Sequence, residues 1–349
     1  MAKITAAQPL LSSPDFSNTF SDDVISEWRR RMEKHPEANI LQSPEWALVN
    51  NAKDDNSIFV KIGEQDFMLA IVRHAKRGRY IEVPAGPIID WGDRPTVMEM
   101  SKKLTMLANQ MSCAFVRIRP QLYDTEDNRI LVNRLSFTPA PMHLGAQNTV
   151  IVNLEQSEDE ILASFRRQTR YEVRQAMKQG IIVEKHTDLE TFEDFHKLQL
   201  ETAKRQHFVP PNFEELKAEH EAFGDKAVIY SAKTEEGELI CYGLILKAGV
   251  EGDYFEAAST ELGRKFPGAY AIQWQVIRDL KAEGYKRYNL FGIAPPNQPE
   301  HRYAKVTTFK TGFGEPINFL PAHDLIIDSN RYRFNVLVEN IRKKKRHLG

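Results

Sequence analysis

The same succession of secondary structure is predicted twice along the chain, and this repetition limits the possible folds more than any other feature. In each half, three β-strands joined by short turns precede a helix, and a further strand follows that helix. The first copy is predicted at 57–61, 66–75, 79–83, 95–111 and 114–119. The second copy is predicted at 227–233, 239–248, 253–258, 269–283 and 286–291. We therefore expect two α/β units of similar topology.

Turn residues mark the ends of the elements in the second copy. Glu236-Gly237 and Glu251-Gly252 are typical of hairpin turns. Pro267-Gly268 precedes the predicted helix and Gly284 follows it, as is usual at helix ends. A three-stranded meander, a helix and another strand is the core order of an N-acyltransferase of the GNAT type. The repeat therefore predicts an α/β (α+β) fold with two tandem GNAT-like acyltransferase domains packed around a common cleft.

The length of 349 residues is sufficient for two packed cores. We expect residues 1–150 to form the first GNAT-like domain and residues 151–319 the second. Residues 320–349 follow the second domain and could return to the first.

Composition excludes several functional classes. The formal net charge of −1 means that any contact with nucleic acid must come from local clusters. Cys113 and Cys241 each lie in an apolar run and predict neither a disulfide framework nor a metal site. The ten histidines form no HExxH or other ligand spacing, and glycine-rich dinucleotide and P-loop motifs are absent. Without a signal peptide or an apolar run long enough to span a bilayer, the chain is predicted to be cytoplasmic.

A single helix is predicted between the two copies, at about 158–179. Its apolar stripe has helical spacing and consists of Leu162, Phe165, Thr169, Val173 and Ala176. Arg166, Arg170 and Arg174 fall on an adjacent face, which favours a phosphate-rich ligand such as tRNA, although such a row is often only a solvated helix face. A second basic run, 342–346, could be a disordered tail, a patch for anionic headgroups at the membrane surface, or an RNA contact.

One lysine near the C-terminus lies between aromatic residues and glycines, in the segment Phe309-Lys310-Thr311-Gly312-Phe313-Gly314. Such a lysine could offer a positive charge to a developing oxyanion with little water around it. The alternative is a solvated lysine in a turn.

Seven segments in order resemble the Fem family of peptidoglycan-bridge aminoacyltransferases, between about residues 40 and 327. They are Leu41-Gln42-Ser43-Pro44-Glu45-Trp46, Gly86-Pro87-Ile88-Ile89-Asp90, the basic segment 169–176, Glu201-Thr202-Ala203-Lys204-Arg205, Tyr270-Ala271-Ile272-Gln273-Trp274, the segment 284–292 and Phe309-Lys310-Thr311-Gly312-Phe313-Gly314.

The resemblance implies two GNAT-like domains, with the C-terminal segment rejoining the first. It also implies transfer of an amino acid from aminoacyl-tRNA to an amine of a peptidoglycan precursor, which is lipid-linked or a UDP-MurNAc-peptide, without a cofactor. Some members carry a long helical arm in the second domain, for which 201–226 leaves no room.

The family's functional residues map onto five positions. Lys310 is similar to the lysine that stabilises the oxyanion, and Phe309 lies beside the reacting centre. Arg205 resembles the arginine that contacts the precursor's phosphates, with a surface salt bridge as the alternative. Tyr270 and Gln273 are expected to line the cleft, although Tyr270 could equally belong to the core.

Two positions depart from the family pattern. Leu48 and Asn50 follow the first tryptophan, where some members have a phosphate-binding lysine. Arg119 precedes Pro120, where some have an aspartate. The general base is therefore left unassigned, and deprotonation assisted by the substrate is the simplest scheme.

Two other functional classes share part of these sequence features. A CoA-dependent GNAT acetyltransferase needs backbone donors in the turn before the second-copy helix, but Pro267 removes one and the glycine spacing is wrong. A non-catalytic RNA- or membrane-binding protein would use the basic helix and the C-terminal run. Lys310 and Arg205 argue weakly against that second alternative.

Overall fold

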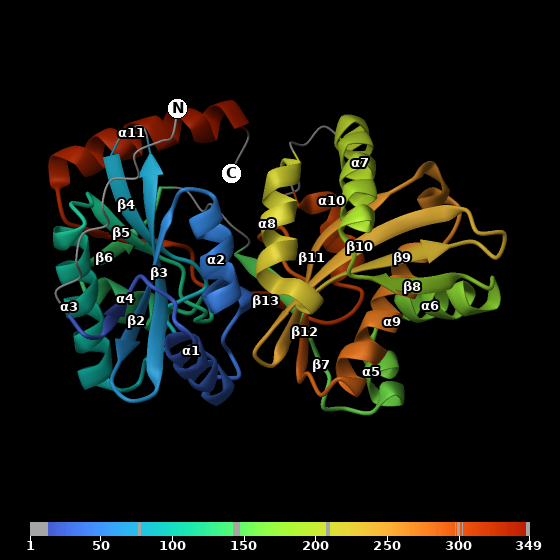
Figure 1. The fold of residues 1–349 in the computed structure, drawn as a ribbon, viewed down its shortest axis with the longest axis horizontal. Helices are drawn as coiled ribbons and strands as arrows, with labels where there is room; N and C mark the ends of the chain where they lie inside the picture. Colours follow the sequence, from blue (N-terminus) through green and yellow to red (C-terminus); the bar gives the residue numbers. More distant parts are fainter. Residues whose placement is uncertain are drawn as a thin grey trace. The chain divides into compact units, whose positions relative to one another are not determined.

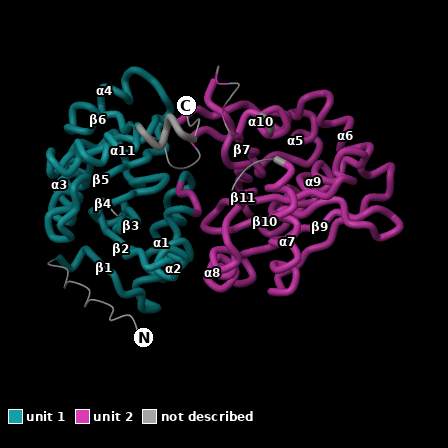
Figure 2. The backbone as a smooth tube through the Cα atoms, turned by 90° about the horizontal axis from the view of Figure 1, so that it is seen from above, with its two compact units in different colours: residues 1–37, 41–143, 320–346 teal, residues 38–40, 144–319, 347–349 magenta. Residues whose placement is uncertain are grey.

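The chain forms two compact units in a computed structural model that describes residues 13–75, 78–141, 147–206, 210–296, 298, 301 and 303–346 (Figure 1). Unit 1 comprises residues 1–37, 41–143 and 320–346, and unit 2 comprises residues 38–40, 144–319 and 347–349 (Figure 2). The expected domain boundary after residue 150 falls inside a strand, β7 (Asn148–Asn153), which belongs to unit 2.

Unit 1 contains a seven-stranded sheet in the order β1-β2-β3-β4-β5-β14-β6. The strands are β1 (Phe16–Ser17), β2 (Asn56–Ile62), β3 (Asp66–Ala75), β4 (Gly78–Val83), β5 (Phe115–Ile118), β6 (Phe137–Pro139) and β14 (His323–Ile326). The helices are α1 (Asp22–Lys34), α2 (Pro44–Ala52), α3 (Arg94–Gln110), α4 (Glu126–Arg134) and α11 (Ser329–Arg346), and a 3-10 turn η1 (Ile40–Gln42) precedes α2. Within the sheet only β4 and β5 pair in parallel.

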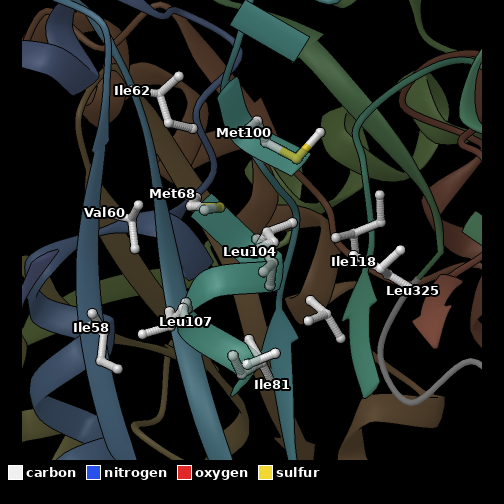
Figure 3. Close-up of a cluster of buried hydrophobic side chains, with 14 of the residues drawn as sticks. Ile58, Val60, Ile62, Met68, Ile81, Met100, Leu104, Leu107, Ile118 and Leu325 are labelled. Carbon is white, nitrogen blue, oxygen red and sulfur yellow. The ribbon is translucent and has the colours of Figure 1, made fainter. Parts of the chain in front are cut away.

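One hydrophobic cluster of unit 1 lies between the sheet and α3, and a second group, which includes Trp28 of α1 stacked on Phe59 of β2, is buried apart from it. The side chain of Asp93 caps α3 by accepting from the Thr96 N–H, and a proline occupies its first turn. Met100, Leu104 and Leu107 then recur at helical spacing and are fully buried against the alternating strand residues (Figure 3). This packing confirms the predicted strand–strand–strand–helix–strand order of the first copy.

The C-terminal segment is part of unit 1, because β14 pairs between β5 and β6. On the neighbouring strand β5, the guanidinium of Arg117 contacts two carboxylates. Its Nε lies 2.7 Å from Asp324 Oδ1, and its Nη2 lies 3.1 Å from Glu339 Oε2 in α11. All three side chains are almost completely buried, so removal of any one would leave uncompensated charge in the core.

Unit 2 contains a second seven-stranded sheet in the order β13-β7-β12-β11-β10-β9-β8. Its strands besides β7 are β8 (Ile182–His186), β9 (Ala227–Lys233), β10 (Leu239–Ala248), β11 (Glu251–Ser259), β12 (Arg287–Asn289) and β13 (Pro316–Asn318). Its helices are α5 (Glu158–Ser164), α6 (Arg167–Lys178), α7 (Leu189–Gln206), α8 (Phe213–Phe223), α9 (Gly268–Ala282) and α10 (Ala304–Lys310), with 3-10 turns η2 (Gly224–Lys226) and η3 (Glu261–Arg264). The second predicted meander, helix and strand are thus confirmed as β9, β10, β11, α9 and β12. Helices α7 and α8, of 18 and 11 residues, form no long arm in the described part of this unit.

The prediction of one helix over 158–179 is wrong, because the chain leaves helical geometry between α5 and α6. Phe165 has ψ of 150° and Arg166 has ψ of 145°, both extended. Phe165 is fully buried against Trp274 and Phe313, and the Arg166 N–H donates to the Gly312 carbonyl at 2.9 Å. Tertiary packing of Phe165 and this hydrogen bond therefore override the local helical pattern.

Candidate active site

Two parallel strands diverge in unit 2 and create a fork in the sheet. β11 pairs with β12 only at residues 251–253 and then continues beside β10 to Ser259. The β12 chain turns away after Leu290, where Phe291 has φ of +58°. The Asn289 side chain stabilises this turn by accepting from the Phe291 N–H at 2.9 Å. A β-bulge between the pairs Leu244–Glu256 and Ile245–Tyr254 places Phe255 as the extra residue of β11.

Lys310 lies at this fork, at the C-terminal end of α10. Its Nζ donates to the Gly292 carbonyl at 3.0 Å, on the β12 side. On the β11 side, the same Nζ lies 5.8 Å from the centroid of the Tyr254 ring. Burial disfavours the charged form and lowers the pKa of Lys310 to about 7. Among the described residues no carboxylate forms an ion pair with Lys310, and burial alone accounts for the shift of its pKa.

Aromatic rings surround the base of Lys310. Phe309 lies 5.0 Å from Tyr270 and 5.2 Å from Phe313, measured between ring centroids. Tyr270 also stacks on Phe313 at 5.9 Å, and Phe313 contacts Phe165 at 5.1 Å. Phe309 and Tyr270 are half-buried, whereas Phe165 and Phe313 are fully buried. These ring contacts therefore hold the C-terminal end of α10 in place, and Phe309 and Tyr270 remain partly exposed.

Gly312 allows α6 to approach the Lys310 segment. A Cβ at this position would lie 2.1 Å from Thr169 Oγ1 and 3.0 Å from the Phe309 carbonyl oxygen. A contact of 2.1 Å does not occur between real atoms, so any residue other than glycine would force Thr169 or the neighbouring backbone to shift. The sequence predicted that Thr169 faces a core, and it is fully buried here.

The three arginines of the predicted anion-binding row differ in their contacts. Arg166 Nη2 donates to the Thr308 carbonyl at 2.8 Å, and Arg170 donates to the carbonyls of Ala163 and Phe165. Arg174 is exposed on α6. The Arg170 guanidinium thus stabilises the break between α5 and α6, and the Arg166 guanidinium joins that break to α10.

Arg205 lies at the other end of β11 from the fork. Its Nη2 donates to the Ser259 carbonyl and to Thr202 Oγ1, and its Nη1 lies 3.2 Å from Glu261 Oε1. Ser259 lies five positions after Tyr254 in β11, which corresponds to about 16 Å along the strand. The salt bridge considered as an alternative for Arg205 is therefore present.

Gln273 does not line a surface, contrary to the sequence-based expectation. Its side chain is fully buried, and its Oε1 accepts from the Tyr288 hydroxyl at 2.6 Å. α9 directs Gln273 toward the sheet because Ile272, Val276 and Ile277 occupy the same face. Its role is to satisfy a buried phenol beside the fork.

A buried pair of carboxyl groups adjoins the fork. Glu251 and Asp253 are both fully buried, and the Asn39 amide donates to them at 2.7 and 3.3 Å. Arg287 Nη2 lies 2.7 Å from Glu251 Oε2, and Asn289 Nδ2 lies 3.3 Å from Glu251 Oε1. One arginine faces two carboxyls, so burial and mutual repulsion raise the pKa of Asp253 well above its usual range.

Two motifs of the first copy meet in unit 1. The Gln42 amide accepts from the Leu69 N–H and donates to the Pro84 carbonyl. A Cβ on Gly86 would lie 2.8 Å from the Gln42 side chain, so this glycine lets the turn after β4 close over the amide. These motifs are therefore structural, whereas the motifs at 270–274 and 284–292 contribute Tyr270 and Gly292 beside Phe309 and Lys310.

Tyr254 and Gly292 were missed as partners of Lys310 when the sequence was interpreted. Gly292 ends one of the quoted motifs, but its place in the sequence does not reveal that its carbonyl accepts a hydrogen bond from Lys310. Tyr254 belongs to no motif. The signal for it is positional, because it follows the last β11 residue that pairs with β12.

The profile of the FemAB family matches residues 25–132, 142–241 and 231–334. The chain belongs to the FemAB family. Curated relatives include aminoacyltransferase FemA of Staphylococcus epidermidis, 30% identical over 84 residues, which are 24% of this chain and 20% of that protein. Aminoacyltransferase FemA of Staphylococcus aureus is 31% identical over 64 residues, 18% of this chain and 15% of the relative. The chain thus matches only about a fifth of the length of these relatives.

Solved structures share the fold over most of the chain. FemX has a TM-score of 0.80 at 16% identity, covering 89% of this chain and 98% of FemX. L-PGS from Bacillus licheniformis has a TM-score of 0.56 at 12% identity, covering 91% and 95%. A tandem GNAT protein from the clavulanic acid biosynthesis pathway has a TM-score of 0.50 at 10% identity, covering 88% and 95%. The predicted pair of GNAT-like domains is confirmed.

Proposed function

We propose that this protein is an aminoacyltransferase that moves an amino acid from aminoacyl-tRNA to an amine of a peptidoglycan precursor, either lipid-linked or a UDP-MurNAc-peptide. Membership of the FemAB family and the likeness to proteins named aminoacyltransferase support the reaction class. The single observation that carries the proposal is Lys310, a lysine without a carboxylate partner among the described residues, placed where two parallel strands separate.

The chemistry requires charge stabilisation more than a nucleophile. The donor is an ester and is already activated, so the acceptor amine attacks the ester carbon directly. The carbonyl oxygen then gains a negative charge, the attacking nitrogen loses a proton, and the tRNA ribose oxygen takes up a proton as it leaves when the tetrahedral intermediate collapses. Lys310 supplies the positive charge opposite the oxyanion, and its effect is large because the surroundings have a low dielectric constant.

The lowered pKa of Lys310 is compatible with this role and gives it a pH signature. With a pKa of about 7, the side chain is close to half protonated at neutral pH before substrate binds. A neighbouring oxyanion favours the charged form, so the pKa rises as the intermediate develops. If the cation is required, turnover decreases as pH rises through the folded-state pKa. If neutral Lys310 acted as a base instead, turnover would increase over the same range.

The other predicted residues surround this centre in the proposal. Phe309 and Tyr270 form an apolar edge that excludes water from the ester. Arg205 binds the acceptor's phosphates, in competition with Glu261, and Arg166, Arg170 and Arg174 attract the tRNA backbone.

A CoA-dependent acetyltransferase is less well supported by the geometry. The start of α9 would have to present backbone N–H groups to a pyrophosphate. Instead, Pro267 precedes the helix, and Gly268 is buried so closely that a Cβ there would lie 2.6 Å from Ile240 Cγ2.

The deciding experiment measures single-turnover transfer by purified protein. Charged tRNAs are offered pairwise with lipid-linked muropeptide, UDP-linked muropeptide and phosphatidylglycerol. Lys310→Met is expected to lower the rate constant by on the order of a hundredfold or more, with acceptor and tRNA binding nearly unchanged. Lys265→Met, at an exposed position before α9, is the matched control. Transfer by Lys310→Met at the parent rate would refute the role of Lys310, and a parent that transfers to none of these acceptors would refute the proposed reaction.

Arg205 has its own matched control. Arg264 also pairs with Glu261, with Nη1 3.3 Å from Oε2, but its side chain is 79% exposed. Arg205→Ala is expected to raise the apparent Kd for either phosphate-bearing muropeptide, whereas Arg264→Ala leaves it unchanged. Equal acceptor binding by both variants would assign Arg205 to structure alone.

A further inference from the structure

Helix α11 has an unusual distribution of side chains. On the face that packs on unit 1, the two most buried side chains are polar, Asn335 and Glu339, and Glu339 contacts Arg117, while Tyr332 packs against Phe115. The opposite face is apolar, since Phe334 is 55% exposed and Leu337 is 58% exposed. These two side chains are three residues apart and therefore neighbours on one helix face. Ile341 continues the same spacing in the sequence.

The charge of the same helix is strongly one-sided. Between residues 329 and 349 the sequence has seven basic residues and one acidic residue, Glu339. Glu339 is buried in an ion pair, so it does not neutralise the basic residues. Five of the seven follow one another at 342–346, directly after the apolar positions.

We propose that α11 is a membrane-docking surface that inserts Phe334 and Leu337 into the interface of a bilayer and places the run 342–346 against anionic headgroups. An apolar face at helical spacing combined with clustered lysine and arginine is the pattern of helices that lie in the membrane surface. Binding to RNA would use the basic run but would leave the exposed phenylalanine and leucine without a function. Among the described residues no helix is both long and apolar enough to cross a bilayer, so this contact is peripheral.

Docking at this surface goes beyond the proposed aminoacyl transfer and does not depend on it. It would bring the enzyme to acceptors that reside in the membrane, and it can be measured without tRNA or muropeptide. Success or failure of the transfer assay is therefore a separate result.

The test is co-sedimentation of the full-length protein with two kinds of vesicle, phosphatidylcholine alone and equal parts phosphatidylcholine and phosphatidylglycerol. The parent is expected to bind the anionic vesicles more tightly, with affinity that decreases as salt increases. Phe334→Ser combined with Leu337→Ser is expected to lower binding at least about tenfold. Lys343→Gln combined with Lys344→Gln and Lys345→Gln is expected to lower it by on the order of a hundredfold and to weaken its salt dependence.

Met98→Ser combined with Met177→Ser is the matched control, because these side chains on α3 and α6 are 55% and 56% exposed. This variant should bind vesicles like the parent. The proposal is overturned if the parent does not sediment with anionic vesicles, if the Phe334 and Leu337 variant binds like the parent, or if the control loses as much binding. It is also overturned if the lysine variant loses affinity for bulk tRNA while keeping its affinity for vesicles. Circular dichroism of each variant verifies that α11 remains folded.

Discussion

Substitution of Gly312 by alanine tests the packing that holds Lys310 at the fork. The added Cβ would lie 2.1 Å from Thr169 Oγ1, 3.0 Å from the Phe309 carbonyl oxygen and 3.3 Å from Arg166 Nη2. Gly312 does not have a positive φ, so the whole effect comes from these contacts and none from backbone strain. Either the 311–313 turn or α6 must move away.

The size of the effect can be estimated from two terms. Overpacking of a well-filled site costs about 1–3 kcal/mol of unfolding free energy. The hydrogen bond from the Arg166 N–H to the Gly312 carbonyl contributes about 0.5–1.5 kcal/mol and is strained by the same movement. Together, the two terms are expected to lower the free energy of unfolding by roughly 2–4 kcal/mol. Because Lys310 is two residues away, a displacement of about 1 Å would also lower kcat by about a hundredfold.

A double-mutant cycle with Thr169→Ala separates the clash from other effects. Removal of Oγ1 takes away the 2.1 Å contact and leaves the Phe309 carbonyl at 3.0 Å as the shortest. The double variant should recover about 1–2 kcal/mol relative to the sum of the single changes, measured by urea unfolding. Gly314→Ala is the control in the same motif, since its Cβ would meet Val150 Cγ1 at 3.1 Å and the Ile151 carbonyl oxygen at 3.7 Å, without the 2.1 Å contact found at Gly312. Equal stability and turnover of the two alanine variants would refute the argument.

Three further predictions concern charge. Tyr254→Leu removes the ring that favours charged Lys310. The pH at which turnover is lost should therefore decrease by about half a unit. An unshifted pH–rate profile would contradict the contact. Asp253 next to Glu251 has a raised pKa, so its contribution to stability is full below the unfolded-state pKa and is lost as pH rises through the folded-state pKa. Asp253→Asn should remove this slope of about 1.4 kcal/mol per pH unit, and thermal unfolding across pH would show whether the slope persists. Arg117→Met removes the cation that faces two buried carboxylates and should cost about 3–5 kcal/mol in urea unfolding, whereas a loss below about 1 kcal/mol would disprove the pairing.

Elements whose pattern is repeated along their whole length could be predicted from the sequence. The strands at 227–233 and 239–248 match β9 and β10 to the residue, because alternation and flanking turn residues act locally. The helix at 158–179 could not be predicted correctly. Its break at Phe165 depends on Trp274 and Phe313, which are more than a hundred residues away in the chain. Helical periodicity contains no information about such contacts.

The candidate site shows the same division between local and distant information. Lys310 was identified from its neighbours in sequence, but its partners Gly292 and Tyr254 depend on where β11 and β12 separate. Gln273 was expected to line the cleft because residue type alone does not distinguish an amide that binds a ligand from one that satisfies a buried phenol. Gln273 accepts a hydrogen bond from the hydroxyl of Tyr288, which lies 15 residues further along the chain, in β12.

The two copies of the fold differ at the point where chemistry would occur. In unit 1, β4 ends at Val83 in the same register as Ile118 of β5, and the Arg119 N–H still donates to the Val83 carbonyl. The chain then turns at once, and buried Glu82 is neutralised by Arg73 and Arg119. In unit 2, β11 extends six residues beyond its last pair with β12. The strands of unit 1 therefore end together around paired charges, whereas those of unit 2 separate beside a lysine that no described carboxylate neutralises. This asymmetry supports assignment of acyl transfer to the second copy.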